Sequence, residues 1–315
     1  MKTLKRGPWS SERVNVTGAV EKERQMKIES LKKIREQEEE ARKRLSQIKY
    51  KLVVLSGKGG VGKSFITANL AAALAKKGFE VGVLDADIHG PSIPKMFGIH
   101  GQAIYAGPAG LLPIAGVGGV RVVSADLMLP DEDTALIWRG PLKTGFIREL
   151  LSMVAWGPLD FLLVDLPPGT GDEPLTIAQL IKDLNGAIVV TTPSDLTRIV
   201  VKKAITFCKQ LNVPLLGVVN NMSHFTCPVC GTKHYIFGQA GTSRLTEETG
   251  VRVLADIPID PRINESVDNG VPFVLAYPES ETARSLMDLA ERVVEALKAT
   301  PEAVREGTSS SGQGP

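Results

Sequence analysis

Eight consecutive residues, Gly57 to Ser64, constrain the fold of this chain more than any other segment. They read Gly-Lys-Gly-Gly-Val-Gly-Lys-Ser and fit the pattern G-x-x-x-x-G-K-[ST] in full. The apolar run Leu52–Leu55 precedes them, and a helix-like run, FITANLAAALAKKG, follows them. Glycines let the backbone wrap around an anion with its N–H groups pointing inward, and the next helix adds the positive end of its dipole. The segment therefore predicts a phosphate-binding loop between a strand and a helix.

The loop also supplies side chains for nucleotide chemistry. We expect Lys63 to neutralise the β- and γ-phosphates of ATP and the Ser64 hydroxyl to bind Mg²⁺. Lys58 is a second lysine, which the ordinary phosphate loop does not require. The candidate nucleotide-binding residues of the loop are Gly57, Lys58, Gly59, Gly60, Val61, Gly62, Lys63 and Ser64.

The chain from Lys51 onward has the pattern of an α/β fold. Apolar runs of strand length alternate with helix-length stretches, and most of the runs lack polar alternation, which is typical of parallel strands buried on both faces. We therefore predict a doubly wound, mostly parallel sheet flanked by helices. The glycine-rich segment 107–119 is expected to form a turn or hairpin. The expected strands are Leu52–Leu55, Val81–Leu84, Val120–Ser124, Phe161–Val164, Ala187–Thr191, Leu215–Val219 and Val253–Ile257.

Four segments are predicted along the chain. Residues 1–17 form a flexible arm, and residues 18–49 form a charged amphipathic helix with a narrow apolar stripe. The helix either lies on the globular body or forms a short coiled coil. Residues 50–298 form the P-loop ATPase domain, with a cysteine loop at 224–238, and residues 299–315 form a disordered tail. The stripe consists of Leu31, Ile34, Ala41, Leu45 and Ile48.

Composition argues against several classes of partner. The 315 residues are 43% hydrophobic and 23% charged, as in ordinary globular proteins. A formal net charge of +2 gives no global electrostatic reason to bind nucleic acid or an anionic membrane. No apolar run reaches the roughly 20 residues that span a bilayer, and the N-terminus lacks the apolar core of a secretory signal. We expect a cytoplasmic protein.

Carboxylates stand where two of the predicted strands end. Asp85 and Asp87 follow the second strand, in D-A-D-I-H-G-P, and Asp165 ends the strand FLLVD. Ligands of α/β sheets bind at the carboxyl ends of the strands, so these side chains should lie near the phosphate loop. Asp165 is the main Mg²⁺ candidate and Asp85 a second one. His89 is expected to be a solvated loop histidine.

The chain has three cysteines, an odd number that argues against a disulfide framework. Cys208 lies on the apolar face of a predicted helix and is expected to pack in the core. Cys227 and Cys230 form a C-x-x-C pair, and two thiolates are half of a tetrahedral or cuboidal ligand set.

Three arrangements of this pair remain open. A homodimer brings two pairs together across its two-fold axis to hold one bridging cluster. Alternatively, His224 and His234 join the cysteines to hold Zn²⁺ within one chain. A redox dithiol is the third interpretation, although the predicted fold is not that of thioredoxin-type proteins.

The motifs occur together in the order of a known family. They are K-G-G-V-G-K-S, D-A-D-I-H-G-P-S-I-P, W-R-G-P, D-L-P-P-G-T-G-D, N-M-S-x-F-x-C-P-x-C-G and I-P-I-D-P-R-I. Through them, residues 51–297 resemble the Mrp/ApbC-type iron–sulfur cluster carriers of the deviant-Walker-A superfamily, which includes MinD, ParA and the nitrogenase iron protein. The resemblance implies a slow, Mg²⁺-dependent ATPase that forms a homodimer. It also implies a [4Fe-4S] cluster shared by two protomers on Cys227 and Cys230, received from a scaffold and delivered to apoproteins.

The same resemblance implies roles for single residues. Lys58 reaches the nucleotide of the partner protomer, as an arginine finger does. Asp87, in switch I, orients the attacking water, and Gly169, in switch II, offers its N–H to the γ-phosphate. Asn221 contacts the adenine edge.

The sequence departs from the family in two ways. No cysteine precedes Cys208, so the N-terminal ferredoxin-like cluster of some relatives is not expected, and Asn220 replaces a usual acidic residue. Arg139 and Lys143 face either the dimer seam or solvent. The alternative functions are a MinD/ParA-like positioning ATPase and a zinc-stabilised ATPase without a carrier role. The polar C-terminal tail and the lack of a basic composition argue against a membrane or DNA switch.

Overall fold

The computed structural model describes residues 16–88, 90–128, 140–181, 183–193, 197–238, 246–247 and 249–299. Most of the predicted arm and tail therefore lies outside the described residues, as do His89 and Arg139.

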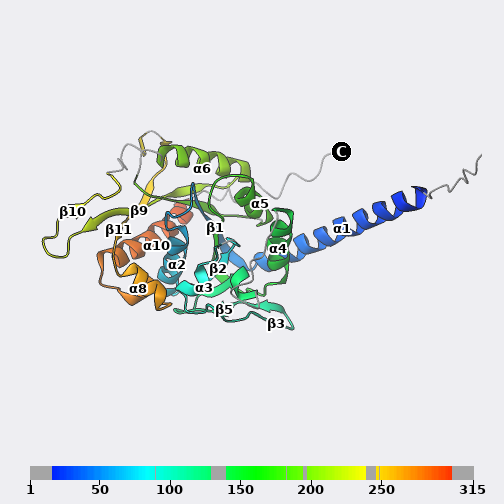
Figure 1. Cartoon of the computed structure of the whole chain (residues 1–315), viewed down its shortest axis with the longest axis horizontal. Helices are drawn as coiled ribbons and strands as arrows, with labels where there is room; N and C mark the ends of the chain where they lie inside the picture. Colours follow the sequence, from blue (N-terminus) through cyan, green and yellow to red (C-terminus); the bar gives the residue numbers. More distant parts are fainter. Residues whose placement is uncertain are drawn as a thin grey trace, which may run out of the picture.

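One mixed sheet of nine strands, among the described residues, forms the centre of the molecule (Figure 1). Its strands are β1 (Ile48–Ser56), β2 (Val81–Asp85), β5 (Ile114–Ala115), β6 (Arg121–Ser124), β7 (Leu159–Asp165), β8 (Gly186–Thr191), β9 (Leu215–Thr226), β10 (Lys233–His234) and β11 (Val253–Ile259). The order is β10-β9-β8-β1-β7-β2-β6-β5, and β11 pairs with β9. Only β5 and β10 pair antiparallel within this described sheet. The predicted doubly wound, mostly parallel sheet is confirmed.

Helices cover both faces of the sheet, and the sheet separates the hydrophobic core into two clusters. One face carries α2 (Lys63–Lys76), α3 (Ile93–Met96), α8 (Ile263–Asp268), α9 (Phe273–Ala276) and α10 (Glu281–Ala299). The other carries α4 (Gly140–Met153), α5 (Asp172–Leu180) and α6 (Thr197–Leu211). Successive strand residues point to opposite faces, so Leu52 and Val54 of β1 pack with α2 whereas Val53 and Leu55 pack on the other side. This is why the strand shows no polar alternation.

A small hairpin stands apart from the main sheet. Strands β3 (Tyr105–Gly107) and β4 (Gly110–Leu112) pair antiparallel, and the glycine-rich segment continues into β5. Gly110 has φ +124°, and a Cβ there would lie 2.1 Å from the carbonyl oxygen of Met153, so only glycine fits. The hairpin predicted within 107–119 is confirmed.

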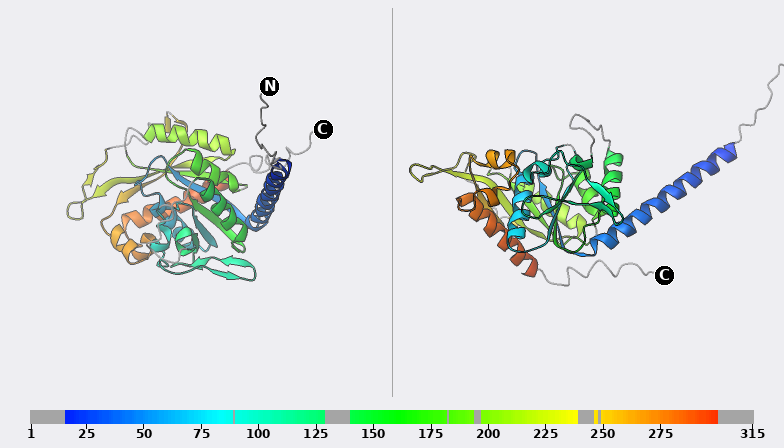
Figure 2. Two further views of the ribbon diagram at one scale, coloured as in Figure 1. Left: turned by 45° about the vertical axis from the view of Figure 1, so that its right-hand side comes forward. Right: turned by 90° about the horizontal axis from the view of Figure 1, so that it is seen from below.

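The N-terminal helix α1 (Val16–Leu45) packs against the body through its C-terminal part. Ala41 and Leu45 are buried in the core beside α4. In contrast, Met26, Ile28 and Leu31 are 63%, 45% and 51% exposed, and the helix projects away from the sheet (Figures 1 and 2). No helix in the described ranges is both long and apolar enough to cross a bilayer.

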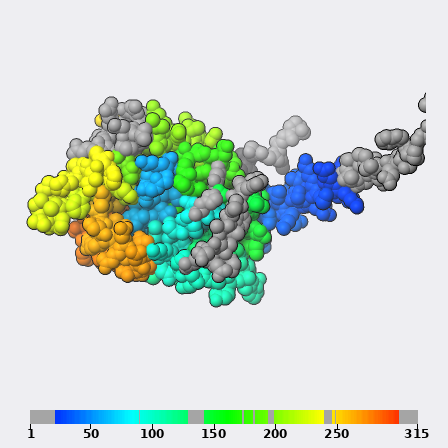
Figure 3. Space-filling model, viewed as in Figure 1, coloured from blue at the N-terminus to red at the C-terminus, as the bar shows by residue number. Residues whose placement is uncertain are grey.

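The cysteine loop lies at the end of the molecule opposite α1. Strand β9 runs out of the sheet to Thr226, and the chain turns through the two cysteines into β10. The space-filling view shows this segment, in yellow, protruding from the body (Figure 3).

Candidate nucleotide site and cysteine half-site

The phosphate loop follows β1, which lies between β7 and β8. Gly60 and Gly62 have φ of +76° and +81°, the left-handed region that side-chain-bearing residues rarely adopt. A Cβ on Gly59 or Gly60 would meet no atom within 4 Å, whereas one on Gly62 would lie 2.3 Å from Nδ2 of Asn221. The loop is thus open on the side of Gly59 and Gly60 and closely backed at Gly62.

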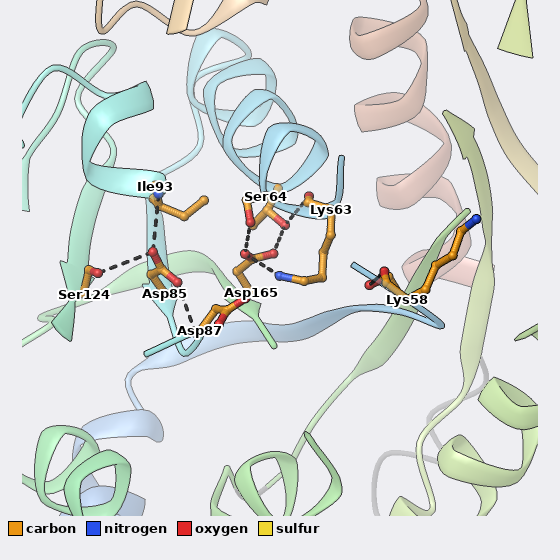
Figure 4. A network of polar contacts seen from close by, with 10 residues as sticks. Lys58, Lys63, Ser64, Asp85, Asp87, Ile93, Ser124 and Asp165 are labelled. Carbon is orange, nitrogen blue, oxygen red and sulfur yellow. Dashed lines mark hydrogen bonds and ion pairs between the residues drawn. The ribbon is translucent and has the colours of Figure 1, made fainter. Parts of the chain in front are cut away.

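Asp165 accepts hydrogen bonds from three polar side chains at the start of α2. The fully buried carboxylate accepts hydrogen bonds from Nζ of Lys63 at 2.6 Å and from the Ser64 hydroxyl at 2.5 Å (Figure 4). Its second oxygen accepts one from the Thr67 hydroxyl at 2.7 Å. The parallel register of β1 and β7 pairs Val54 with Asp165, which brings the carboxylate beside the loop.

This arrangement brings together the three residues that were predicted to bind phosphate and Mg²⁺. Lys63 is only 6% exposed, so Asp165 is the counter-ion of a buried ammonium group. A phosphate group that binds Lys63, or a cation that binds Ser64, has to exchange partners with this carboxylate.

Asp85 lies beside Asp165, since the β2–β7 register pairs the two residues directly. Its oxygens accept hydrogen bonds from the N–H groups of Asp87 at 3.2 Å and Ile93 at 3.3 Å and from the Ser124 hydroxyl at 3.3 Å. Burial, and then the charge of Asp165, raises the pKa of Asp85 to about 8. Burial and the neighbouring carboxylate of Asp165, which contacts Lys63 directly, thus disfavour ionisation of Asp85.

The residues given a role in catalysis by resemblance lie around this centre. Lys58 is exposed and its side chain points away from Lys63 and Asp165 (Figure 4). Asp87 is half-buried after β2. The Gly169 N–H donates to the Ser56 carbonyl at 2.9 Å, so this bond has to break before the N–H can bind a γ-phosphate.

Strand β9 joins the loop to the cysteines. Asn221 is 4% exposed, and its Nδ2 donates to the Val61 carbonyl at 2.9 Å, which supports the loop from behind. Its contact with adenine stays a prediction. Met222 follows with φ +57°, where the register between β9 and β11 is irregular. This local bulge separates the loop contact from the cysteine end of the strand.

The three cysteines differ in environment. Cys208 is 4% exposed, and burial raises its pKa to about 12, so its predicted packing role is confirmed. Cys227 is half-buried and Cys230 exposed, in a turn closed by hydrogen bonds from Cys227 N to Thr232 O and from Gly231 N to Cys227 O, both 2.9 Å. The Thr232 side chain, 3.2 Å from Sγ, lowers the pKa of Cys230. The exposed thiol thus shifts toward the thiolate, the form that binds metals.

The intrachain zinc arrangement is not formed. Within the ranges that the structure describes, no three His, Cys, Asp or Glu side chains lie together as a metal site. His224 is buried, and its ring nitrogens lie 3.0 Å from the Ser223 hydroxyl and 3.3 Å from a Glu281 oxygen. The two cysteines therefore remain a half-site.

Glu281 is a site residue that the sequence analysis missed. This first residue of α10 accepts hydrogen bonds from Thr226 at 2.9 Å and Lys233 at 3.0 Å, on either side of the cysteine turn. Burial favours a higher pKa, but the bonds from Lys233, Thr226 and His224 outweigh it and lower the pKa of Glu281 to about 2. No local signal links residues 55 positions apart.

Two further residues bear on the sequence predictions. Thr67 stands four positions after Lys63 on one helix face, a spacing that could have identified it as a partner of Asp165. Lys143 was predicted to face either the dimer seam or solvent. It is only 6% exposed, so the prediction that it faces solvent is wrong.

A loop after a central strand, a lysine and a serine at the start of the next helix, and an aspartate on the adjacent strand define a P-loop NTPase. The comparisons agree. The family described as "ParA: NUBPL iron-transfer P-loop NTPase" matches residues 47–294. The chain is 47% identical over 255 residues to the iron-sulfur cluster carrier protein of Saccharolobus solfataricus, covering 81% of this chain and 86% of that protein. It is 43% identical over 260 residues to the cytosolic Fe-S cluster assembly factor CFD1 of Saccharomyces cerevisiae, covering 81% and 89%.

Solved structures give the same result. A nucleotide-binding protein from Archaeoglobus fulgidus in complex with ADP superposes with a TM-score of 0.67 at 44% identity, covering 74% of this chain and 91% of that one. MinD from Pyrococcus horikoshii, complexed with Mg-ADP, shares the fold with a TM-score of 0.60 at 24% identity, covering 80% and 100%. The chain therefore belongs to the NUBPL iron-transfer family of P-loop NTPases, as the resemblance in its motifs predicted.

Proposed function

We propose that this protein is an ATP-hydrolysing iron–sulfur carrier. Two copies hold one [4Fe-4S] cluster between their Cys227 and Cys230 pairs, receive it from a scaffold and deliver it to apoproteins. Hydrolysis is slow and Mg²⁺-dependent and serves cluster transfer. The yeast relative is named a cytosolic factor, which agrees with the predicted cytoplasmic location.

The nucleotide half of the proposal rests on residues that fit Mg-ATP. Gly59 and Gly60 border open space beside the loop, and Lys63 and Ser64 stand at the helix start in contact with Asp165. Bound Mg-ATP supplies the phosphoryl group and the cation that compensates its charge. Lys63 then neutralises the β- and γ-phosphates, and the Ser64 hydroxyl binds Mg²⁺ with Asp165, and with Asp85 as a further acidic group.

Catalysis in this site depends on positioning and charge. Asp87 lies after β2, close to the loop, where it orients the attacking water. Lys58 projects outward and supplies its charge to the nucleotide of the partner protomer. The proposal thus includes a homodimer that faces the loops toward each other.

The observation that carries the proposal is the half-site on β9. Two thiols follow the end of the strand, one half-buried and one exposed, and the chain offers them no third ligand among its described residues. A cuboidal cluster takes four thiolates, so a second copy of the same pair completes the set with two-fold symmetry. The same strand contacts the phosphate loop through Asn221, which gives nucleotide and cluster a shared structural element.

The test is iron, acid-labile sulfide and zinc per protomer after anaerobic reconstitution. Wild-type protein should bind about four irons and four sulfides per dimer. A Cys227→Ala/Cys230→Ala variant should bind none, whereas Cys208→Ala is the matched control and should load like wild type because that thiol is buried. Zinc without sulfide, or iron uptake that survives the double substitution, would refute the carrier function.

A second measurement addresses coupling. Cluster transfer to an apo-ferredoxin should proceed at different rates with ATP, with ADP and without nucleotide, because coupling requires the states to bind the cluster with different free energies. Identical rates in all three conditions would leave a carrier whose ATPase activity does not drive transfer.

A further inference from the structure

Four exposed apolar side chains lie in and just after the cysteine turn. Val229, between the cysteines, is 93% exposed, and Tyr235, Ile236 and Phe237 are 45%, 61% and 50% exposed. We call these four residues the apolar tip. Exposed apolar side chains gathered in one short segment are typical of interaction surfaces.

Contacts with Glu281 and His224 tie the segment that carries the tip to the domain. Glu281 binds Thr226 and Lys233 on both sides of the turn, and the Tyr235 ring lies 6.0 Å from the ring of His224, which itself is buried. The backbone on both sides of the cysteine turn is therefore held against the domain, which lowers the entropic cost of burying Tyr235 and its neighbours against another surface.

The charge of the tip permits it to meet a copy of itself. Between Thr226 and Gly238 there is no acidic residue, and the one lysine, Lys233, forms an ion pair with Glu281 at 3.0 Å. A two-fold axis places the same patch on both sides of an interface. An uncharged apolar surface is compatible with that symmetry, whereas a charged one would repel its copy.

We propose that the apolar tips of two copies close around the shared cluster as a hydrophobic collar, with Ile236 and Phe237 as its main exposed members. The inference rests on the proposed function, because the cysteines fix where the two copies meet. The collar limits water access to the iron and sulfur atoms, since the apolar shell around a metal site controls solvent access and local dielectric.

The apolar area of the tip indicates whether two copies associate before or after the cluster binds. A buried aromatic side chain covers roughly 150–250 Å², so four half-exposed side chains offer on the order of 400 Å² per protomer. A stable interface buries about 800 Å² per partner. The tips alone therefore do not hold two apoproteins together, and this contact forms when the cluster is loaded.

The experiment compares wild type with Ile236→Ser/Phe237→Ser after anaerobic reconstitution without nucleotide. The matched control is Leu112→Ser, which removes an apolar side chain 46% exposed on β4, outside the cysteine turn. Light scattering gives the mass before and after loading, and iron release to a chelator gives cluster retention. We expect wild type and control to gain mass on loading, and the double variant to release iron at least tenfold faster while its ATPase activity is unchanged.

The outcomes separate the two proposals. If wild type binds no cluster, the proposed function fails and the collar with it. If wild type loads and the double variant matches it in mass and iron release, only the collar is refuted. Normal retention with slower delivery to an apo-ferredoxin would assign the tip to a recipient protein and overturn its assignment to a second copy. Wild-type apoprotein that is already dimeric through the tip, with the dimer lost in the double variant, would overturn the cluster-dependent order.

Discussion

Gly62 is the position where the structure gives the sharpest energetic prediction. In Gly62→Ala, an alanine has to adopt φ +81°, which costs about 1–2 kcal/mol for a residue with a Cβ. The new Cβ would also lie 2.3 Å from Nδ2 of Asn221, so the amide has to move and lose its bond to the Val61 carbonyl. Asn221 is 4% exposed, and leaving such a buried polar group unpaired costs about 1–3 kcal/mol. The total destabilisation is about 2–5 kcal/mol.

Gly60→Ala is the matched control. Gly60 has nearly the same φ, +76°, but a Cβ there meets nothing within 4 Å, so only the conformational cost of about 1–2 kcal/mol applies. Urea unfolding without nucleotide measures both, with the midpoint reporting stability when the slope is unchanged. In an Asn221→Ala background the clash is absent, and the two alanine substitutions should cost the same. Equal costs in wild type, or a difference that persists without Asn221, would refute the reasoning.

Three other substitutions test separate parts of the structure. Leu45→Ala should lower the free energy of unfolding by about 2–5 kcal/mol and speed hydrogen exchange in α1, because Leu45 is 2% exposed. Leu31→Ala, on the projecting part of α1, should change the free energy of unfolding by less than about 0.5 kcal/mol. Equal effects of the two substitutions would contradict the packing of the C-terminal part of α1 against the body. Asp165→Asn should destabilise the nucleotide-free protein by about 3–5 kcal/mol in denaturant unfolding, since it leaves buried Lys63 without its counter-ion; wild-type stability would show that the ammonium is not desolvated. Hydrogen bonds hold the pKa of Glu281 at about 2, below its ordinary 4.5, so the stability that its carboxylate contributes is full above pH 4.5 and is lost as the pH falls toward 2. Glu281→Gln should flatten the profile of unfolding free energy against pH in that window. A profile parallel to wild type would show that the Glu281 contacts with Thr226 and Lys233 do not stabilise the fold.

The parts of the site that were predictable are those encoded by local pattern plus parallel topology. The loop from Gly57 to Ser64 is a contiguous motif, and its flanks define which strand and helix it joins. Asp85 and Asp165 end separate strands, and parallel strands bring their carboxyl ends to one edge, so their proximity follows without knowledge of the register. The register then places them as direct neighbours.

Contacts that depend on tertiary docking could not be read from the sequence. Glu281 reaches the cysteine turn only because α10 packs against β11 at the required angle. Periodicity predicted an apolar helix stripe that ends at Ile48, but α1 ends at Leu45 and Ile48 is the first residue of strand β1. Periodicity also could not show what covers the stripe, since Leu31 is exposed while Leu45 is buried. Asn221 was recognised from its motif, yet its bond to Val61 requires the position of β9 behind the loop.

The continuity of β9 has a thermodynamic consequence. Asn221 and Cys227 are six positions apart, a rise of about 20 Å at the spacing of a strand, and Met222, with its positive φ, lies at the start of this span. If the proposed carrier changes its hold on the cluster when nucleotide binds, reciprocity requires that cluster loading change the affinity for nucleotide by the same factor. Nucleotide affinity should then differ between protein without cluster and protein with cluster, and the difference reports cluster occupancy. A carrier built in this way reports its own cargo at the ATP site.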